Sequence, residues 1–212
     1  MLSASGIVLV RGNTCIAAGI DFELAAGGAL FVSGDNGSGK STLLRALCGL
    51  QRPYAGELRW RGQPLAADGQ TLRRELLHVG HDDALHPDLT PLENVQLLER
   101  LAGGSPARHA VAQALDVAGL AAQMHLPLRC LSRGQRRRVA LARLALSRKP
   151  LWVLDEPLAA LDDAAVDVIR GWLQAHLMGG GLAVVTCHSD PWLPTESTQL
   201  LRLKRPAPAI AA

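Results

Sequence analysis

Short apolar runs recur along the chain and predict strands of two kinds. Continuous apolar runs are typical of parallel strands buried on both faces. They predict buried strands at 29–33, 151–154 and 182–186, and we predict two further strands at 76–80 and 199–203. The opening third also contains a run that alternates apolar and polar residues, 20–24, and a pair of runs separated by a turn. There we predict strands at 7–10 and 20–24, and a hairpin of 57–60 with 63–65 around Gly62. The pattern therefore indicates an α/β fold with a parallel core and an antiparallel β region.

Helical spacing of apolar residues fills most of the segments between these strands. Thr90, Pro91 and Glu93 predict a well-defined helix start, with Thr90 as N-cap and Glu93 completing a capping box. That helix is expected to end near Leu101. Further helices are predicted at 43–48, 107–118, 134–147 and 163–178. No strand is predicted between about 85 and 130, so this part is a helical insert. Residues 1–205 then form one domain, and the low-complexity tail 206–212 is expected to be disordered.

A glycine-rich stretch between the 29–33 strand and the helix that follows it carries the clearest chemical signal. It fits the P-loop pattern G-x-x-x-x-G-K-[ST], whose glycines let backbone N–H groups surround phosphate oxygens. Lys40 can reach the outer phosphates, and the Ser41 hydroxyl can ligate Mg²⁺. An ordinary glycine-rich loop is the alternative, but strand, loop and helix are the context that a nucleotide site needs. The predicted nucleotide-binding residues are Gly34, Asp35, Asn36, Gly37, Ser38, Gly39, Lys40, Ser41 and Thr42.

Two carboxylates, Asp155 and Glu156, follow directly after the apolar run 151–154. In a P-loop enzyme this position holds the second acid associated with Mg²⁺. We interpret Asp155 as part of the Mg²⁺ shell, either directly or through water. Glu156 can then act as the general base that orients and polarises the attacking water. Surface acids at a strand end are the alternative, which the upstream P-loop disfavours.

The arginine-rich helix predicted at 134–147 begins with a second candidate anion site. Ser132 and Gln135 fit a capping box, so helix structure alone could explain both residues. A helix N-terminus that carries a serine and Gly134 is also suited to bind an anion. This helix start needs a partner before it can share a phosphate with the P-loop.

Together these stretches resemble the nucleotide-binding subunit of ATP-binding-cassette (ABC) transporters. Residues 34–42 match the Walker A motif and 151–156 the Walker B motif. Residues 131–135 are similar to the signature L-S-G-G-Q, with Arg133 in place of the first glycine. Residues 159–162 are similar to the D-loop, with Ala159 in place of serine, and 186–188 to the switch-histidine loop. The order and spacing agree over about 7–203. The resemblance implies a P-loop NTPase with a RecA-like parallel core, an antiparallel β subdomain and a helical insert.

The same resemblance implies an ATPase that uses Mg²⁺ and works as a homodimer. Two copies would dock head to tail and enclose ATP between them. The signature residues Ser132, Gly134 and Gln135 of one copy would then face the γ-phosphate held by Lys40 of the other. His188 would contact the same phosphate. The dimer would power a separate transmembrane permease subunit, as a peripheral protein on the cytoplasmic face of the bacterial inner membrane.

Two positions depart from the common family pattern. His81 lies where most ABC domains have glutamine after the 76–80 strand. It could report the γ-phosphate or Mg²⁺ water to the helical insert, or it could be a loop histidine without a special role. Arg11 aligns with the aromatic residue that stacks on adenine in the family. An arginine can also stack on a base, although Arg11 could equally be a solvated surface residue.

Several local stretches narrow the resemblance to the ATPases of cytochrome c maturation, also described as haem-exporter ATP-binding subunits. They are 79–81, 89–94 and 131–144, although Asp82 replaces a glutamine usual in that group. This implies that ATP hydrolysis drives haem export or the release of a haem chaperone. The alternatives are a subunit of another small exporter, a soluble ABC ATPase acting on DNA or ribosomes, and a non-catalytic nucleotide sensor. The retained Glu156 and His188 argue against the sensor.

Composition mainly excludes other classes of partner and site. The 212 residues carry a formal net charge of +3 that is spread along the chain, so no nucleic-acid partner is expected. The four cysteines are far apart and form neither a zinc nor a haem-attachment motif, so we expect buried thiols in a reducing cytosol. No signal peptide is recognisable. No apolar run is long enough to span a bilayer, so another chain would supply any membrane span.

Overall fold

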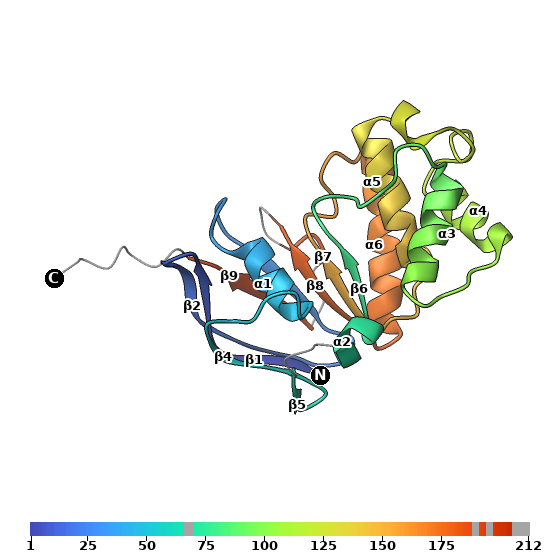
Figure 1. Cartoon of the computed structure of the whole chain (residues 1–212). Coiled ribbons are helices and arrows are strands. Elements are labelled where there is room, and N and C mark those ends of the chain that lie inside the picture. Colours follow the sequence, from blue (N-terminus) through green and yellow to red (C-terminus); the bar gives the residue numbers. More distant parts are fainter. Residues whose placement is uncertain (66–69, 188–190, 194–196, 205–212) are drawn as a thin grey trace.

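The computed structural model describes residues 1–65, 70–187, 191–193 and 197–204. Two sheets and a group of helices make up these residues (Figure 1). The switch-loop residue His188 and the tail 206–212, both singled out from the sequence, lie outside the described residues. Among the described residues, no helix combines the length and the hydropathy that crossing a bilayer requires.

The five-stranded sheet is entirely parallel and forms the core, as predicted. Its strand order is β6-β7-β8-β3-β9. All residues of β3, β7 and β8 are buried, which explains their uninterrupted apolar runs. Because the strands are parallel, their carboxyl ends meet at one edge of the sheet. The strands are β3 (Ala29–Ser33), β6 (Leu76–Val79), β7 (Leu151–Leu154), β8 (Leu182–Thr186) and β9 (Thr198–Arg202).

The second sheet is antiparallel, with the strand order β2-β1-β4-β5. Its members are β1 (Leu2–Arg11), β2 (Thr14–Leu24), β4 (Ala55–Trp60) and β5 (Gln63–Pro64). The predicted hairpin around Gly62 is confirmed. β1 and β2 are longer than the sequence indicates, because register shifts between Ala4 and Val10 interrupt the alternation of apolar and polar residues.

Helices cover both faces of the parallel sheet (Figure 1). α1 (Lys40–Leu47) packs between the two sheets, in a core that it shares with β1, β3 and β8. α6 (Asp163–Met178) and α5 (Arg133–Leu141) pack on the opposite face. The remaining helical elements are α2 (Gln70–Glu75), α3 (Pro91–Leu101), α4 (Arg108–Val117), η1 (Leu128–Cys130) and η2 (Ala142–Ala145).

The segment predicted as a helical insert packs around an apolar cluster of its own. Residues 85–130, all of which the structure describes, contain α3, α4 and η1 and no strand. Thr90 and Glu93 form the predicted capping box: the Thr90 N–H donates to Glu93 Oε2 at 2.8 Å, and the Glu93 N–H donates to Thr90 Oγ1 at 3.2 Å. α3 and α4 enclose their own apolar cluster, which also includes Val139 of α5. The insert is therefore joined to the core through α5.

Two sequence expectations need correction, and one helix was not predicted. The helix predicted at 134–147 ends as an α-helix at Leu141 and continues as the 3₁₀ turn η2, a change that residue propensity does not reveal. The short helix α2 was not predicted, because six residues are too few to show a periodic pattern. Cys48 and Cys187 are buried as expected, but Cys15 and Cys130 are exposed.

Candidate nucleotide-binding and hydrolysis site

The P-loop connects β3 to α1 at the carboxyl edge of the parallel sheet. Its conformation depends on glycine, since Gly34 has a φ of 149° and Gly39, the N-cap of α1, a φ of 102°. Space is also limiting at Gly34, where a Cβ would lie 2.6 Å from both the Leu203 carbonyl oxygen and Ser38 Oγ. No larger residue fits there without moving backbone.

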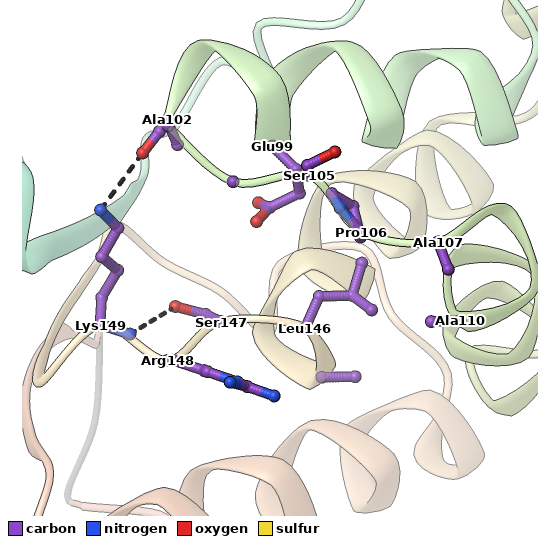
Figure 2. Close-up of a pocket in the computed structure, with 13 residues that line it drawn as sticks. Glu99, Ala102, Ser105, Pro106, Ala107, Ala110, Leu146, Ser147, Arg148 and Lys149 are labelled. Carbon is purple, nitrogen blue, oxygen red and sulfur yellow. Dashed lines mark hydrogen bonds between the residues drawn. The ribbon is translucent and has the colours of Figure 1, made fainter.

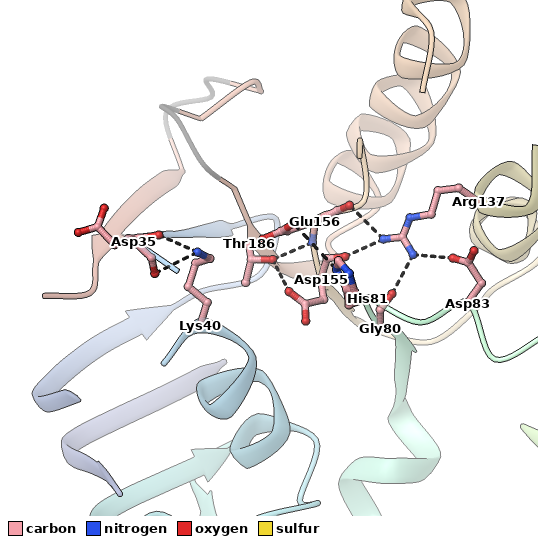
Figure 3. A network of polar contacts seen from close by, with 10 residues as sticks. Asp35, Lys40, Gly80, His81, Asp83, Arg137, Asp155, Glu156 and Thr186 are labelled. Carbon is pink, nitrogen blue, oxygen red and sulfur yellow. Dashed lines mark hydrogen bonds and ion pairs between the residues drawn. The ribbon is translucent and has the colours of Figure 1, made fainter. Parts of the chain in front are cut away.

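Lys40 begins α1 and its side chain turns back along the loop. Its ammonium group donates to the Gly34 carbonyl at 2.6 Å and lies 3.4 Å from the Asp35 carbonyl oxygen (Figure 3). The residue is buried, as is Ser38, whose Oγ has no hydrogen-bond partner among the described residues. A buried ammonium, a buried hydroxyl and the N-terminus of α1 all favour negative charge. This set of groups fits the polyphosphate of a nucleotide.

A cavity of about 250 Å³ lies over the loop and brings several predicted residues together. Arg11 and Glu156 both line it, although they come from β1 and the end of β7. The other lining residues are Ile16, Asp35, Asn36, Gly37, Gly39, Lys40, Ser41 and Thr42. Arg11 lies beside the loop, where its side chain could contact a nucleotide base. Its stacking on adenine stays a prediction.

A larger cavity, of about 760 Å³, lies elsewhere (Figure 2). It is bounded by the end of α3, the loop before α4 and the residues 145–149 that precede β7. In Figure 2, Lys149 reaches across its edge to the Ala102 carbonyl, and Glu99 points into it. Because it lies before the amino end of β7, it is remote from the P-loop. Size alone therefore does not mark the nucleotide site.

The two acids at the end of β7 are held by one threonine. Thr186, the last residue of β8, donates from Oγ1 to Asp155 Oδ1 at 2.7 Å. The same Oγ1 accepts a hydrogen bond from the Glu156 N–H at 2.7 Å. Asp155 and Thr186 are both buried. Asp155 and Ser41 supply oxygen atoms of the kind that Mg²⁺ prefers, so the residues present fit this ion.

Glu156 has a strained backbone and a side chain directed toward the cavity. Its φ of 46° is in the left-handed region, which costs a non-glycine residue about 1–3 kcal/mol. His81 follows β6 and places Nδ1 4.0 Å from Glu156 Oε2. The structure therefore brings His81 close to the proposed general base. His78, two residues after the start of β6, is partly buried, and burial lowers the pKa of its imidazole against the opposing influence of Asp155.

The signature residues do not line the P-loop cavity. Ser132 is exposed at the N-terminus of α5 and forms the predicted capping box with Gln135, in which each accepts a backbone N–H at 2.9–3.2 Å. Gly134 packs closely against the D-loop, because a Cβ there would lie 2.6 Å from the Ala160 carbonyl oxygen. Capping and close packing are thus local roles for this stretch, and Ser132 is left facing outward.

Sequence reasoning gave no role to two residues of the site, Thr186 and Arg137. Arg137, from the middle of α5, donates to oxygen atoms at the ends of β6 and β7 (Figure 3). A signal for Thr186 exists, since a hydroxyl ending a buried apolar strand needs a partner. For Arg137 the signal is weaker, because an arginine-rich helix ordinarily exposes its arginines to solvent.

The fold and the site together define a P-loop ATPase. The ABC transporter family model matches residues 17–159. A solved dimeric ATP-binding cassette in a post-hydrolysis state, bound to ADP and Pi, superposes with a TM-score of 0.77 at 28% identity, covering 89% of this chain and 88% of that one. The chain belongs to the ABC transporter family, and it is an ATPase subunit of the ABC type.

Curated relatives narrow the position of the chain within the family. The cytochrome c biogenesis ATP-binding export protein CcmA of Dechloromonas aromatica is 44% identical over 203 residues, covering 96% of this chain and 100% of that protein. The protein of the same name from Aromatoleum aromaticum is 47% identical over 191 residues, covering 90% of this chain and 89% of its own. The resemblance to the cytochrome c maturation group is therefore confirmed, as is the predicted fold class.

Proposed function

We propose that the chain is the ATP-hydrolysing subunit of a membrane ABC complex that serves c-type cytochrome biogenesis, through haem export or release of a haem chaperone. The observation that carries the pathway is the 44% identity, over 96% of the chain, to a cytochrome c biogenesis ATP-binding export protein. The site supports the chemistry, because Lys40 and Glu156 line one cavity. An ATPase subunit of another small exporter is the second candidate.

In the proposed reaction the P-loop binds the phosphates of ATP. Lys40 neutralises the outer phosphates, and the N-terminus of α1 contributes its partial positive charge. Ser41 and Asp155 would hold Mg²⁺, which when bound neutralises developing charge on the phosphoryl oxygens. Glu156 accepts a proton from the attacking water. Thr186 fixes the backbone N–H of Glu156 and the carboxylate of Asp155, so both acids keep their places at the end of β7.

The proposed active form is a homodimer arranged head to tail. Its support is the outward-facing Ser132 at the N-terminus of α5, a helix start that suits a phosphate supplied by a second copy. In this arrangement Gly134 and Gln135 would face the same phosphate as Ser132, and His188 would contact that phosphate. A solved ATP-binding cassette of 26% identity is also described as dimeric. The name of the curated relatives, an export protein, supports a separate transmembrane subunit and a peripheral place on the cytoplasmic face of the inner membrane.

Two substitutions test the chemistry. Glu156→Gln should retain ATP binding but stop hydrolysis and hold an ATP-bound dimer. The exposed Glu23→Gln is the control and should bind and hydrolyse ATP like the wild type. Undiminished turnover in Glu156→Gln would contradict the assignment of Glu156 as the general base. Lys40→Ala should weaken ATP binding by more than about tenfold, and wild-type affinity would contradict the P-loop assignment.

The pathway needs a different experiment. Recovery of the tagged chain from bacterial membranes, followed by mass spectrometry of bound proteins, should identify a transmembrane subunit of cytochrome c biogenesis. Recovery of the permease of an unrelated exporter instead would favour the second candidate.

A further inference from the structure

Arg137 is a buried arginine whose guanidinium group joins three segments of the site. Nη1 donates to the Gly80 carbonyl and to Asp83 Oδ1, both at 2.8 Å. Nη2 donates to the Asp155 carbonyl at 2.6 Å and lies 3.1 Å from the Glu156 carbonyl oxygen. Figure 3 shows the group between these oxygens, with Asp83 on one side and Asp155 and Glu156 on the other. Only 5% of the residue is exposed.

The charge of Arg137 is balanced mostly by backbone dipoles. Asp83 is its carboxylate partner, in an ion pair whose arginine side chain is 6% exposed and whose aspartate is 22% exposed. The other acceptors are main-chain carbonyls at the ends of two parallel strands. A planar guanidinium can serve these separate directions at once, whereas an ammonium presents a single point charge. The contacts therefore depend on the arginine fork as well as on the charge.

Together with Thr186, Arg137 holds both backbone polar groups of Glu156, the N–H and the carbonyl. Its N–H is fixed by Thr186 and its carbonyl by Arg137, on either side of a Cα in the left-handed region. A strained backbone persists only where its surroundings determine it fully. Loss of the contact at the carbonyl lets the residue relax, and relaxation turns its carboxylate away from the position it now has.

We propose that Arg137 is a positioning residue that fixes Glu156 and the loop of residues 80–83, which contains His81, relative to α5. Arg137 lies on the same helix as the exposed Ser132, so a ligand engaged at the start of α5 acts on a rigid element that holds the hydrolytic carboxylate. The same guanidinium holds Gly80 and Asp83, at the entrance to the helical insert. This inference rests on the proposed role of Glu156 as general base.

The first test compares Arg137→Lys with Arg138→Met. Arg138 is the next residue of α5, and its side chain contacts the Ala118 carbonyl of the insert at 3.3 Å, away from the acids. We expect Arg137→Lys to lower kcat by about tenfold to 100-fold, since small displacements of catalytic groups have effects of this size. KM and the affinity for ATP should change by less than about threefold. Arg138→Met should retain the wild-type kcat.

A second variant keeps the test decisive if Arg137→Lys does not fold. Asp83→Asn keeps an acceptor oxygen for Arg137 and removes only the charge, so it should lower kcat less than Arg137→Lys without changing ATP affinity. The two effects should be non-additive in the double variant, because both act through one guanidinium. A wild-type kcat in Arg137→Lys, or in Asp83→Asn where the lysine variant is unfolded, overturns the proposal. Equal losses of kcat and ATP affinity also overturn it.

The Glu156→Gln variant separates this inference from the function on which it rests. If Glu156→Gln retains turnover, the assignment of Glu156 as the general base is wrong, and the inference about Arg137 loses its basis. An inactive Glu156→Gln together with a fully active Arg137→Lys rejects only the positioning role.

Discussion

Thr186 donates a hydrogen bond from Oγ1 to Oδ1 of Asp155 at 2.7 Å, and both residues are buried. The contact joins the carboxyl ends of β8 and β7, which are neighbours in the parallel sheet. Because the same Oγ1 accepts the Glu156 N–H, one hydroxyl serves both acids. A single oxygen atom therefore contacts both the proposed Mg²⁺ ligand and the proposed general base.

Replacing Thr186 by valine should damage hydrolysis more than nucleotide binding. Valine has nearly the same shape but leaves the Asp155 oxygen and the Glu156 N–H without this partner, which costs about 1–3 kcal/mol for a buried group. We expect a lower unfolding free energy and a kcat reduced by about tenfold. Denaturant unfolding and steady-state ATPase assays measure the two effects. Thr186→Ser keeps the hydroxyl and should stay near wild type; a Val variant with unchanged kcat would contradict the role of this hydrogen bond.

The pair of Glu99 and Arg143 should be important for stability. Arg143 Nε lies 2.9 Å from Glu99 Oε1, and the two side chains are only 12% and 11% exposed. The contact joins α3 of the insert to η2. Removing one partner from a buried pair leaves an uncompensated charge, so Glu99→Ala should lower the unfolding free energy by about 3–5 kcal/mol.

An exposed ion pair provides the control for this prediction. Glu57 and Arg59 are 2.8 Å apart, but their side chains are 45% and 46% exposed. Glu57→Ala should therefore change stability by less than about 1 kcal/mol. Equal effects of Glu57→Ala and Glu99→Ala in denaturant titrations would show that burial does not strengthen the Glu99 pair.

The four cysteines should divide into two reactivity classes. Cys15 and Cys130 are exposed, whereas Cys48 and Cys187 are buried. Burial raises the pKa of the Cys48 thiol to about 12, an effect that Arg73 partly opposes. The thiolate is the reactive form, and at pH 8 a pKa near 12 leaves about one Cys48 in 10,000 ionised. Iodoacetamide on the native protein should therefore modify Cys15 and Cys130 first, as mass spectrometry of peptides would show. Modification of native Cys48 as fast as Cys130 would contradict the packing around α1.

Much of the fold follows directly from the sequence. The buried runs in β3, β7 and β8 have the lengths and apolar character of parallel core strands, and α6 begins and ends at the predicted residues, Asp163 and Met178. Local chemistry explains this success, because Asp162 caps α6 through the Ala165 N–H at 2.9 Å. The strand β1 is recognised only in part, since its shifts in register follow from pairing with β2 and β4.

The site divides in the same way. The P-loop and the two acids are predictable because each is a continuous stretch with its own pattern. The contacts of Thr186 and Arg137 join residues that are 18 to 57 positions apart in the chain. Such contacts depend on the strand order and on the packing of α5, which no local pattern encodes. Ser132, Gly134 and Gln135 stay predictions, because a second copy would be needed to complete their proposed site.

The protein should become less stable as the pH falls from about 7 to 5. His176, at the end of α6, stacks on Trp152 with ring centroids 3.9 Å apart, and Nε2 lies 3.1 Å from the Leu182 carbonyl oxygen. Burial lowers the pKa of His176, against the opposing hydrogen bond, and burial also lowers that of His78. Well above pH 7 both imidazoles are neutral in the folded and the unfolded chain. Below an ordinary pKa near 6.5, the unfolded chain takes up protons first, so the unfolding free energy decreases until the pH passes the folded pKa.

His176→Phe should make this pH dependence shallower, because phenylalanine keeps the stack on Trp152 and cannot be protonated. The exposed His109→Gln provides the matched control and should retain the wild-type slope. Glu93 acts elsewhere on the pH scale: hydrogen bonds from Thr90 lower its pKa, so its contribution is lost only as the pH falls below its ordinary value of 4.5. Denaturant unfolding at pH 7.5 and 5.5 therefore isolates the histidines. A slope that is the same in His176→Phe and the wild type would show that His176 is not kept neutral by its burial against Trp152.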